Sequence, residues 1–90
     1  EPAVLTDIEV AADLNGGSAT AIVETSNDAF QTVTSSGRIA VQDGVQRHAL
    51  DALNVPATAV RVGFELLPGK EATTTPVIDA FRVAAIPAHQ

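Results

Sequence analysis

The chain has 90 residues, no cysteine and a formal net charge of −6 at pH 7. The lack of cysteine excludes disulfide bonds and thiolate metal sites. The acidic balance argues against nucleic acid as a partner, because phosphates are neutralised by clustered lysines and arginines. No apolar run is long enough to insert across a membrane. The length predicts a single small domain over residues 1–90. Because the sequence starts at Glu1 rather than Met, we expect a processed product, an excised domain or the ordered part of a longer chain.

The first half of the chain alternates apolar and polar residues in short runs, the pattern of half-buried β-strands. Residues 3–12 are the first run, and an Asn-Gly-Gly turn that tolerates positive φ ends it. We predict further strands at 20–26, 30–34 and 39–41. The Ser-Ser-Gly sequence at 35–37 is expected to separate the last two.

The second half holds the strongest strand signals. Residues 45–53 fit a strand or a helical turn, and we favour a strand at 45–50 followed by irregular structure. Residues 59–67 are predicted to be a strand, and within them residues 60–66 show a period of two, with apolar residues on one face and Arg61, Gly63 and Glu65 on the other. Residues 77–86 are apolar on both faces apart from Asp79 and Arg82, which is typical of a central strand or of one whose outer face meets another protein.

Short strands at this spacing predict an all-β fold. We expect a jelly-roll-type antiparallel β-sandwich of about seven to eight short strands. Two sheets packed face to face would bury the apolar faces of both.

Three segments resemble known families. Residues 22–30 resemble a segment of galactose-binding-like jelly-roll domains, the superfold of discoidin and carbohydrate-binding modules, in which a β-strand with Ser and Asp is followed by a turn that introduces an aromatic residue. Residues 60–66 resemble the penultimate strand of these domains, in which an Arg alternates with apolar residues. Residues 73–88 are similar to the end of a β-sandwich domain common in minor tail and baseplate proteins of long-tailed phages of actinobacteria. The shared features are a Thr-Pro-Val start and an Arg-x-x-Ala-x-Pro-Ala exit.

The resemblance implies a non-enzymatic structural or adhesion module of a virion, in the tail tip or baseplate. Its partners would be other virion subunits in a symmetric homo-oligomeric assembly, and host-surface glycans. One alternative is a carbohydrate-binding module of a secreted or cell-surface protein, which would be extracellular. The chain has no Trp or Tyr to stack on a sugar ring. A second alternative is a capsid decoration protein.

Two residue groups are candidates for recognition. Asp28, Arg61 and Glu65 carry groups that can hydrogen-bond a glycan, and the alternative is that Arg61 and Glu65 are solvent-facing cross-strand partners. Ala80 and Ala84 permit close approach by a neighbouring subunit, so we expect an interface there. Arg82 lies between them and would reach Asp79, Glu65 or an acidic patch of another subunit.

A structural calcium is the one cofactor that the sequence raises. Asp13 and Asn15 are spaced like the ligands of a calcium loop, with Glu24 in the closing position and Asp28 as a further oxygen donor. However, Ser18 stands where that loop has Gly, and Glu24 falls within a predicted strand. We therefore favour a hairpin turn without metal.

The sequence does not predict an enzyme. His48 and Asp51 are close in sequence, but a nucleophile needs a base within hydrogen-bond reach, and no such pairing can be recognised. His89 falls near the chain end, and the acids alternate with apolar residues as on the solvent face of a strand. Binding residues are expected instead in the loops at 13–18, 26–29 and 68–75.

Overall fold

The computed structural model describes residues 2–50, 53, 55–69 and 75–87. This part of the chain contains β-strands and no α-helix, so none of its segments is an apolar helix of membrane-spanning length. The strands are β1 (Ala3–Asp13), β2 (Ser18–Ser26), β3 (Ser35–Val41), β4 (Gly44–Ala49), β5 (Ala59–Leu67) and β6 (Val77–Pro87).

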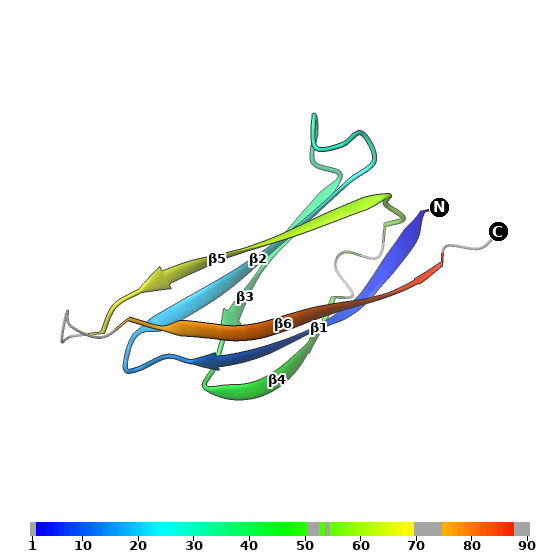
Figure 1. The fold of residues 1–90 in the computed structure, drawn as a ribbon. Helices are drawn as coiled ribbons and strands as arrows, with labels where there is room; N and C mark the ends of the chain where they lie inside the picture. The colour runs from blue at the N-terminus through cyan, green and yellow to red at the C-terminus, as the bar shows by residue number, and fades with distance from the viewer. Residues whose placement is uncertain (1, 51–52, 54, 70–74, 88–90) are drawn as a thin grey trace.

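The strands form two antiparallel three-stranded sheets that pack face to face (Figure 1). Sheet A has the order β4-β1-β6 and sheet B the order β3-β2-β5. The β2–β5 pair falls within the stretch of chain between β1 and β6, and β6 then returns to pair with β1. The prediction of an all-β antiparallel sandwich is confirmed, with six strands in the described residues rather than seven to eight.

The core forms between the two central strands. Ile8 and Val10 on β1 and Ala21 and Val23 on β2 have no exposed surface. They alternate with residues that point outward, so each central strand buries one face against the other sheet. Leu53, which is 2% exposed, adds a large side chain from the connection between β4 and β5.

The predicted strand at 30–34 is wrong, and Ser35-Ser36-Gly37 begins β3 instead of separating two strands. Ala29 and Phe30 have left-handed φ angles of 58° and 65°, which a strand does not allow. The backbone N–H groups of Asp28 and Phe30 donate to the Ser26 hydroxyl at 3.1 Å and 3.0 Å. A side chain therefore satisfies the backbone groups that a neighbouring strand would have bonded.

The two long C-terminal strands are confirmed, as is the strand expected at 45–50, which is β4. Of the two interpretations of the last strand, the central position is excluded, because among the described residues β6 pairs with β1 alone and most of its residues are exposed. β5 is also an edge strand, paired only with β2 in the described residues. Phe64 of β5 and Phe81 of β6 meet edge to face at 5.4 Å between ring centroids, so these two edges lie on the same side of the sandwich.

Candidate functional site

Arg61 and Glu65 lie on the outer face of sheet B and each has an ionic partner. Arg61 is directly opposite Glu24 of β2, and its Nε donates to Glu24 Oε1 at 2.6 Å. Arg38 of β3 reaches across β2 to Glu65, with 2.8 Å between Nη2 and Oε1. Because the side chains of Arg38 and Glu65 are more than half exposed, such a pair contributes only about 0–1 kcal/mol to stability.

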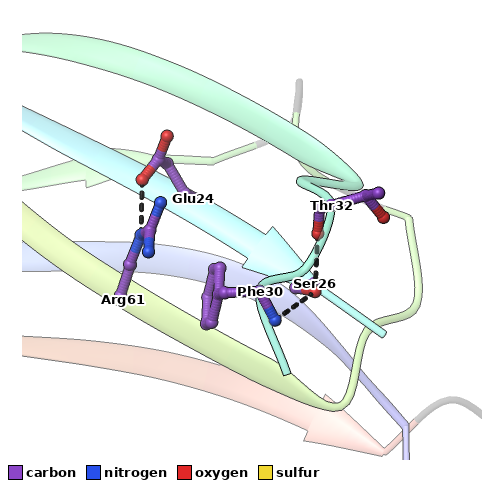
Figure 2. A network of polar contacts seen from close by, with 5 residues as sticks. All are labelled: Glu24, Ser26, Phe30, Thr32 and Arg61. Atoms are coloured by element: carbon purple, nitrogen blue, oxygen red, sulfur yellow. Dashed lines mark hydrogen bonds and ion pairs between the residues drawn. The ribbon is translucent and has the colours of Figure 1, made fainter. Parts of the chain in front are cut away.

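Phe30 covers the guanidinium of Arg61. The Arg61 Cζ lies 4.4 Å from the centroid of the Phe30 ring, a cation–π contact. Figure 2 shows the ring beside Arg61, with Glu24 on the other side of the guanidinium. One face of the only aromatic side chain in this loop is thus occupied by a cation, which leaves less of it for a sugar ring.

Asp28 is engaged in holding its own loop. Thr32 donates to its carboxylate from the hydroxyl at 2.6 Å and from the backbone N–H at 2.9 Å, and the Ser26 hydroxyl lies 2.7 Å from Oδ1. These hydrogen bonds lower the pKa of Asp28 from 3.8 to about 2. The bond from the Thr32 hydroxyl has the largest effect, followed by the bonds from the Thr32 N–H and the Ser26 hydroxyl. The loop therefore presents a permanently charged carboxylate at neutral pH.

The three residues predicted to bind a ligand do not converge on one pocket. Arg61 and Glu65 are four positions apart on β5, about 13 Å along the strand. Asp28 lies in the loop after β2, beyond the end of β2 that Arg61 approaches and away from Glu65. Arg61 and Glu65 lie along the outer face of sheet B and Asp28 lies in the loop beyond its end, so the three residues do not line a concave binding site.

The predicted interface residues lie together on the outer face of sheet A. The register of β4, β1 and β6 arranges this face in three rows across the sheet. The rows, in that strand order, are Val45, Ala11 and Ala80; Arg47, Glu9 and Arg82; and Ala49, Asp7 and Ala84. A small apolar row thus adjoins a charged row of alternating sign.

A shallow hollow of about 100 Å³ opens at the first two rows of this face, lined by Glu9, Ala11, Val45, Ala80, Phe81 and Arg82. Val45 is 71% exposed, the largest exposure among the large apolar residues of the described chain. The Arg82 side chain is 74% exposed, and its Nη2 is 3.9 Å from Glu9 Oε1. Arg82 therefore pairs with neither Asp79 nor Glu65, and Glu65 belongs to the other sheet.

The candidate calcium ligands are parts of a turn. Asp13 Oδ1 accepts the backbone N–H of Asn15 at 3.1 Å, and the Asn15 side-chain amide donates to the Thr75 carbonyl at 2.9 Å. Glu24 is six positions from Ser18 along β2, about 20 Å away, and pairs with Arg61. Within the described ranges, no three His, Cys, Asp or Glu side chains come together in a way that could hold a metal ion.

The histidine of β4 has a hydrogen-bonding role in its strand. His48 lies opposite the buried Ile8, and its Nε2 is 3.1 Å from Gln46 Oε1. Asp51, His89 and residues 70–74 of the predicted binding loop at 68–75 lie outside the described residues.

No protein-family model, curated protein or solved structure matches the chain.

Sequence reasoning missed two residues of these faces, the exposed Val45 and the half-buried Phe30. The sequence places Val45 in a strand but does not show on which face of the sheet it lies. The reason is that the inward positions of β4 are the polar Gln46 and His48, which inverts the usual alternation. Phe30 was placed in a strand. The Ser-x-Asp sequence at 26–28 is the signal that could have found its true position, since these residues often bond the backbone two residues on.

Proposed function

We propose that this chain is a non-catalytic structural or adhesion module of a phage virion that packs against neighbouring subunits through the outer face of sheet A. The observation that carries the proposal is the row of Val45, Ala11 and Ala80, with the most exposed large apolar side chain beside two alanines. Small side chains on a sheet let another backbone approach closely. Covering the row removes apolar surface from water, at roughly 25 cal/mol per Å².

The charged row beside it supports recognition of a specific partner. Arg47, Glu9 and Arg82 alternate in sign across the sheet, so a partner with acids opposite the two arginines is favoured over one with bases. Arg82 is well exposed and its contact with Glu9 is long, so its guanidinium has donors left for such a carboxylate.

The assignment to a phage tail tip or baseplate rests on the resemblance of the C-terminal segment. β6 belongs to that segment and also contributes Ala80, Arg82 and Ala84 to the outer face of sheet A. The partners would be other virion subunits, and the loops at the ends of the strands would contact the host surface.

A carbohydrate-binding module is the second candidate. It is favoured by one observation, the Phe30 ring beside Arg61 and Glu24, which places an aromatic surface next to hydrogen-bonding groups. A single domain with this platform would bind weakly and would need several linked copies.

The test immobilises many copies of the chain on beads. The beads are incubated with purified tails and, separately, capsids of a long-tailed actinobacteriophage, with host cell wall and with a glycan array. Val45→Glu is compared with Val33→Glu, a matched change at a 43% exposed valine in the loop after β2. Circular dichroism verifies that both variants are folded.

We expect the tails to bind the wild type and Val33→Glu, and to bind Val45→Glu at least about tenfold more weakly because a charge enters the apolar row. Binding to glycans or cell wall without binding to tails would replace the proposal with the carbohydrate-binding module. Binding to capsids alone would favour a decoration protein. Equal binding of both variants to tails would exclude the outer face of sheet A.

A further inference from the structure

One edge of β5 has no neighbouring strand in the described part of the chain, and this strand carries a sequence that is complementary to itself. We propose that two copies of this chain pair antiparallel through β5 about a two-fold axis at Gly63. The two copies of sheet B then form one continuous sheet, with the two β5 strands at its centre. The inference uses another element than the outer face of sheet A and stands if that proposal fails.

The self-complementarity follows from the order of residues along β5. With Gly63 opposite itself, Arg61 of one copy lies opposite Glu65 of the second copy, and the axis repeats this pair. Val62 then meets Phe64 of the second copy, and Val60 meets its Leu66. Every charged residue of the strand thus faces the opposite charge, and these apolar residues face apolar residues.

The pairing also matches the two faces of the sandwich. A two-fold axis perpendicular to the sheet keeps outer residues opposite outer residues, and Arg61 and Glu65 are both outer. Val60 and Leu66 both point inward, yet they are 41% and 38% exposed because no strand covers this edge among the described residues. A second β5 would lie against them.

An apolar cavity lies beside Val60. It has a volume of about 120 Å³ between the sheets, and its lining includes Ala3, Leu5, Ala57 and Ala85. In the proposed register, Leu66 of the second copy is the neighbour of Val60 on the same face. An apolar side chain would therefore cover this opening.

Pairing would extend the existing ion pairs into a network. Arg38 already contacts Glu65, and Arg61 already contacts Glu24. Across the axis the order becomes Arg38, Glu65, then Arg61 and Glu24 of the second copy, with alternating sign. Arg61 uses its Nε for Glu24, so the guanidinium has further N–H groups for a second carboxylate.

The edge strand of sheet A, β6, does not have a self-complementary order of charges. In an antiparallel pair of identical strands, opposed residues are an even number of positions apart on the same face. Asp79 and Arg82 of β6 are three apart, so they cannot oppose each other there. The register shift at Asp79 further interrupts β6, whereas β5 pairs with β2 without a shift.

The first experiment exchanges charges across the axis. Arg61→Glu places Glu opposite Glu65, and Glu65→Lys places Lys opposite Arg61, so each variant alone repels its own copy twice. An equimolar mixture restores two attractive pairs. Mass is measured by light scattering with refractive-index detection, since the chain has no Trp or Tyr.

We expect a concentration-dependent wild-type dimer, a dissociation constant about ten- to a hundredfold weaker for each variant alone, and recovery in the mixture. Asp79→Lys reverses a charge at an exposed residue of the other sheet, outside the three rows of sheet A, and should leave the dimer unchanged. Circular dichroism verifies folding. A wild type that stays monomeric at its highest soluble concentration overturns the proposal, as does a dimer that none of the β5 changes weakens.

The second experiment tests the axis without altering a charge. Gly63→Cys introduces the only thiol of the chain, at a position where an added Cβ meets no atom within 4 Å. Opposed Cα atoms in an antiparallel pair are about 4.5–5.5 Å apart, within disulfide range. We expect rapid oxidation to a covalent dimer, and slow oxidation for Val33→Cys in the loop after β2, where Val33 is 43% exposed. Equal rates for both variants would contradict an axis at Gly63.

Discussion

Ser26 organises the polar end of sheet B although it is buried and uncharged. Its side chain has no exposed surface, and its oxygen accepts the backbone N–H groups of Asp28 and Phe30. The hydroxyl also lies 2.8 Å from the Thr32 carbonyl (Figure 2). These contacts fold the loop back and hold Phe30 in a left-handed conformation over Arg61. A single hydroxyl thus sets which side chains the outer face presents.

The carboxylate of Asp28 makes the stability of this loop depend on pH. Its folded-state pKa of about 2 is below the ordinary value of 3.8, so the ionised form is favoured in the folded state. The contribution of this group is complete above about pH 4 and is lost as the pH falls from about 4 to about 2. In unfolding experiments across that range, the stability difference between wild type and Asp28→Asn should shrink steadily.

Asp79→Asn, at an exposed acid of β6, controls for the loss of one negative charge. A stability difference between wild type and Asp28→Asn that stays constant down to about pH 2 would show that the hydrogen bonds to Asp28 do not stabilise its ionised form.

At the scale of elements, the turn between β1 and β2 packs against the end of β5. A Cβ on Gly17 would overlap the Leu67 carbonyl oxygen and lie 3.0 Å from Gly69 N and from Pro76 Cγ. Backbone atoms cannot rotate away as a side chain can. Gly17 is therefore required by close approach between two connections, one between β1 and β2 and the other between β5 and β6.

Two glycine-to-alanine changes separate this requirement from strand propensity. We expect Gly17→Ala to destabilise the fold by about 1–3 kcal/mol, because the added methyl group overpacks a backbone contact. Gly63→Ala, in the open strand β5, should be neutral or stabilising by up to about 1 kcal/mol. Urea unfolding at low protein concentration measures both. Equal costs would show that the turn relaxes away from β5.

At the scale of the whole molecule, stability depends on a narrow aliphatic core. The buried apolar residues of β1 and β2 are Leu, Ile, Val and Ala, and among the described residues the largest fully buried side chain is Ile8. Domains of this size have only about 5–15 kcal/mol of net stability. A single truncation at the centre is therefore a large fraction of the total.

A graded series at the centre tests this view. We expect Ile8→Ala to cost about 2–5 kcal/mol and Ile8→Val about 0.5–1.5 kcal/mol, because both remove buried methyl groups. Val45→Ala, at the most exposed valine, should stay within about 0.5 kcal/mol of the wild type. Denaturant unfolding compares the three. A cost at Val45 equal to that at Ile8 would contradict the placement of the core.

Much of the fold could be predicted because alternation is a local property of the chain. The apolar positions of β1, β2 and β5 repeat every second residue, which identifies both the strand and the face that it buries. The sandwich follows, since each one-sided apolar strand needs a second sheet. The candidate positions Arg61 and Glu65 of β5, and Ala80 and Arg82 of β6, were also visible as outward or unusual residues within their strands.

Which strands are neighbours is decided by the tertiary structure. The sequence alone does not show that Arg38 reaches Glu65 across β2, or that Glu9 stands between Arg47 and Arg82. It also does not separate a central position of β6 from an edge position. It predicts a strand at 30–34, where the backbone N–H groups of Asp28 and Phe30 bond to Ser26 instead of to a neighbouring strand. The self-complementary order of residues in β5 is present in the sequence, but it can serve pairing only because no other described strand lies along that edge. Periodicity is read from neighbours along the chain, whereas pairing and edges depend on contacts between residues far apart in it.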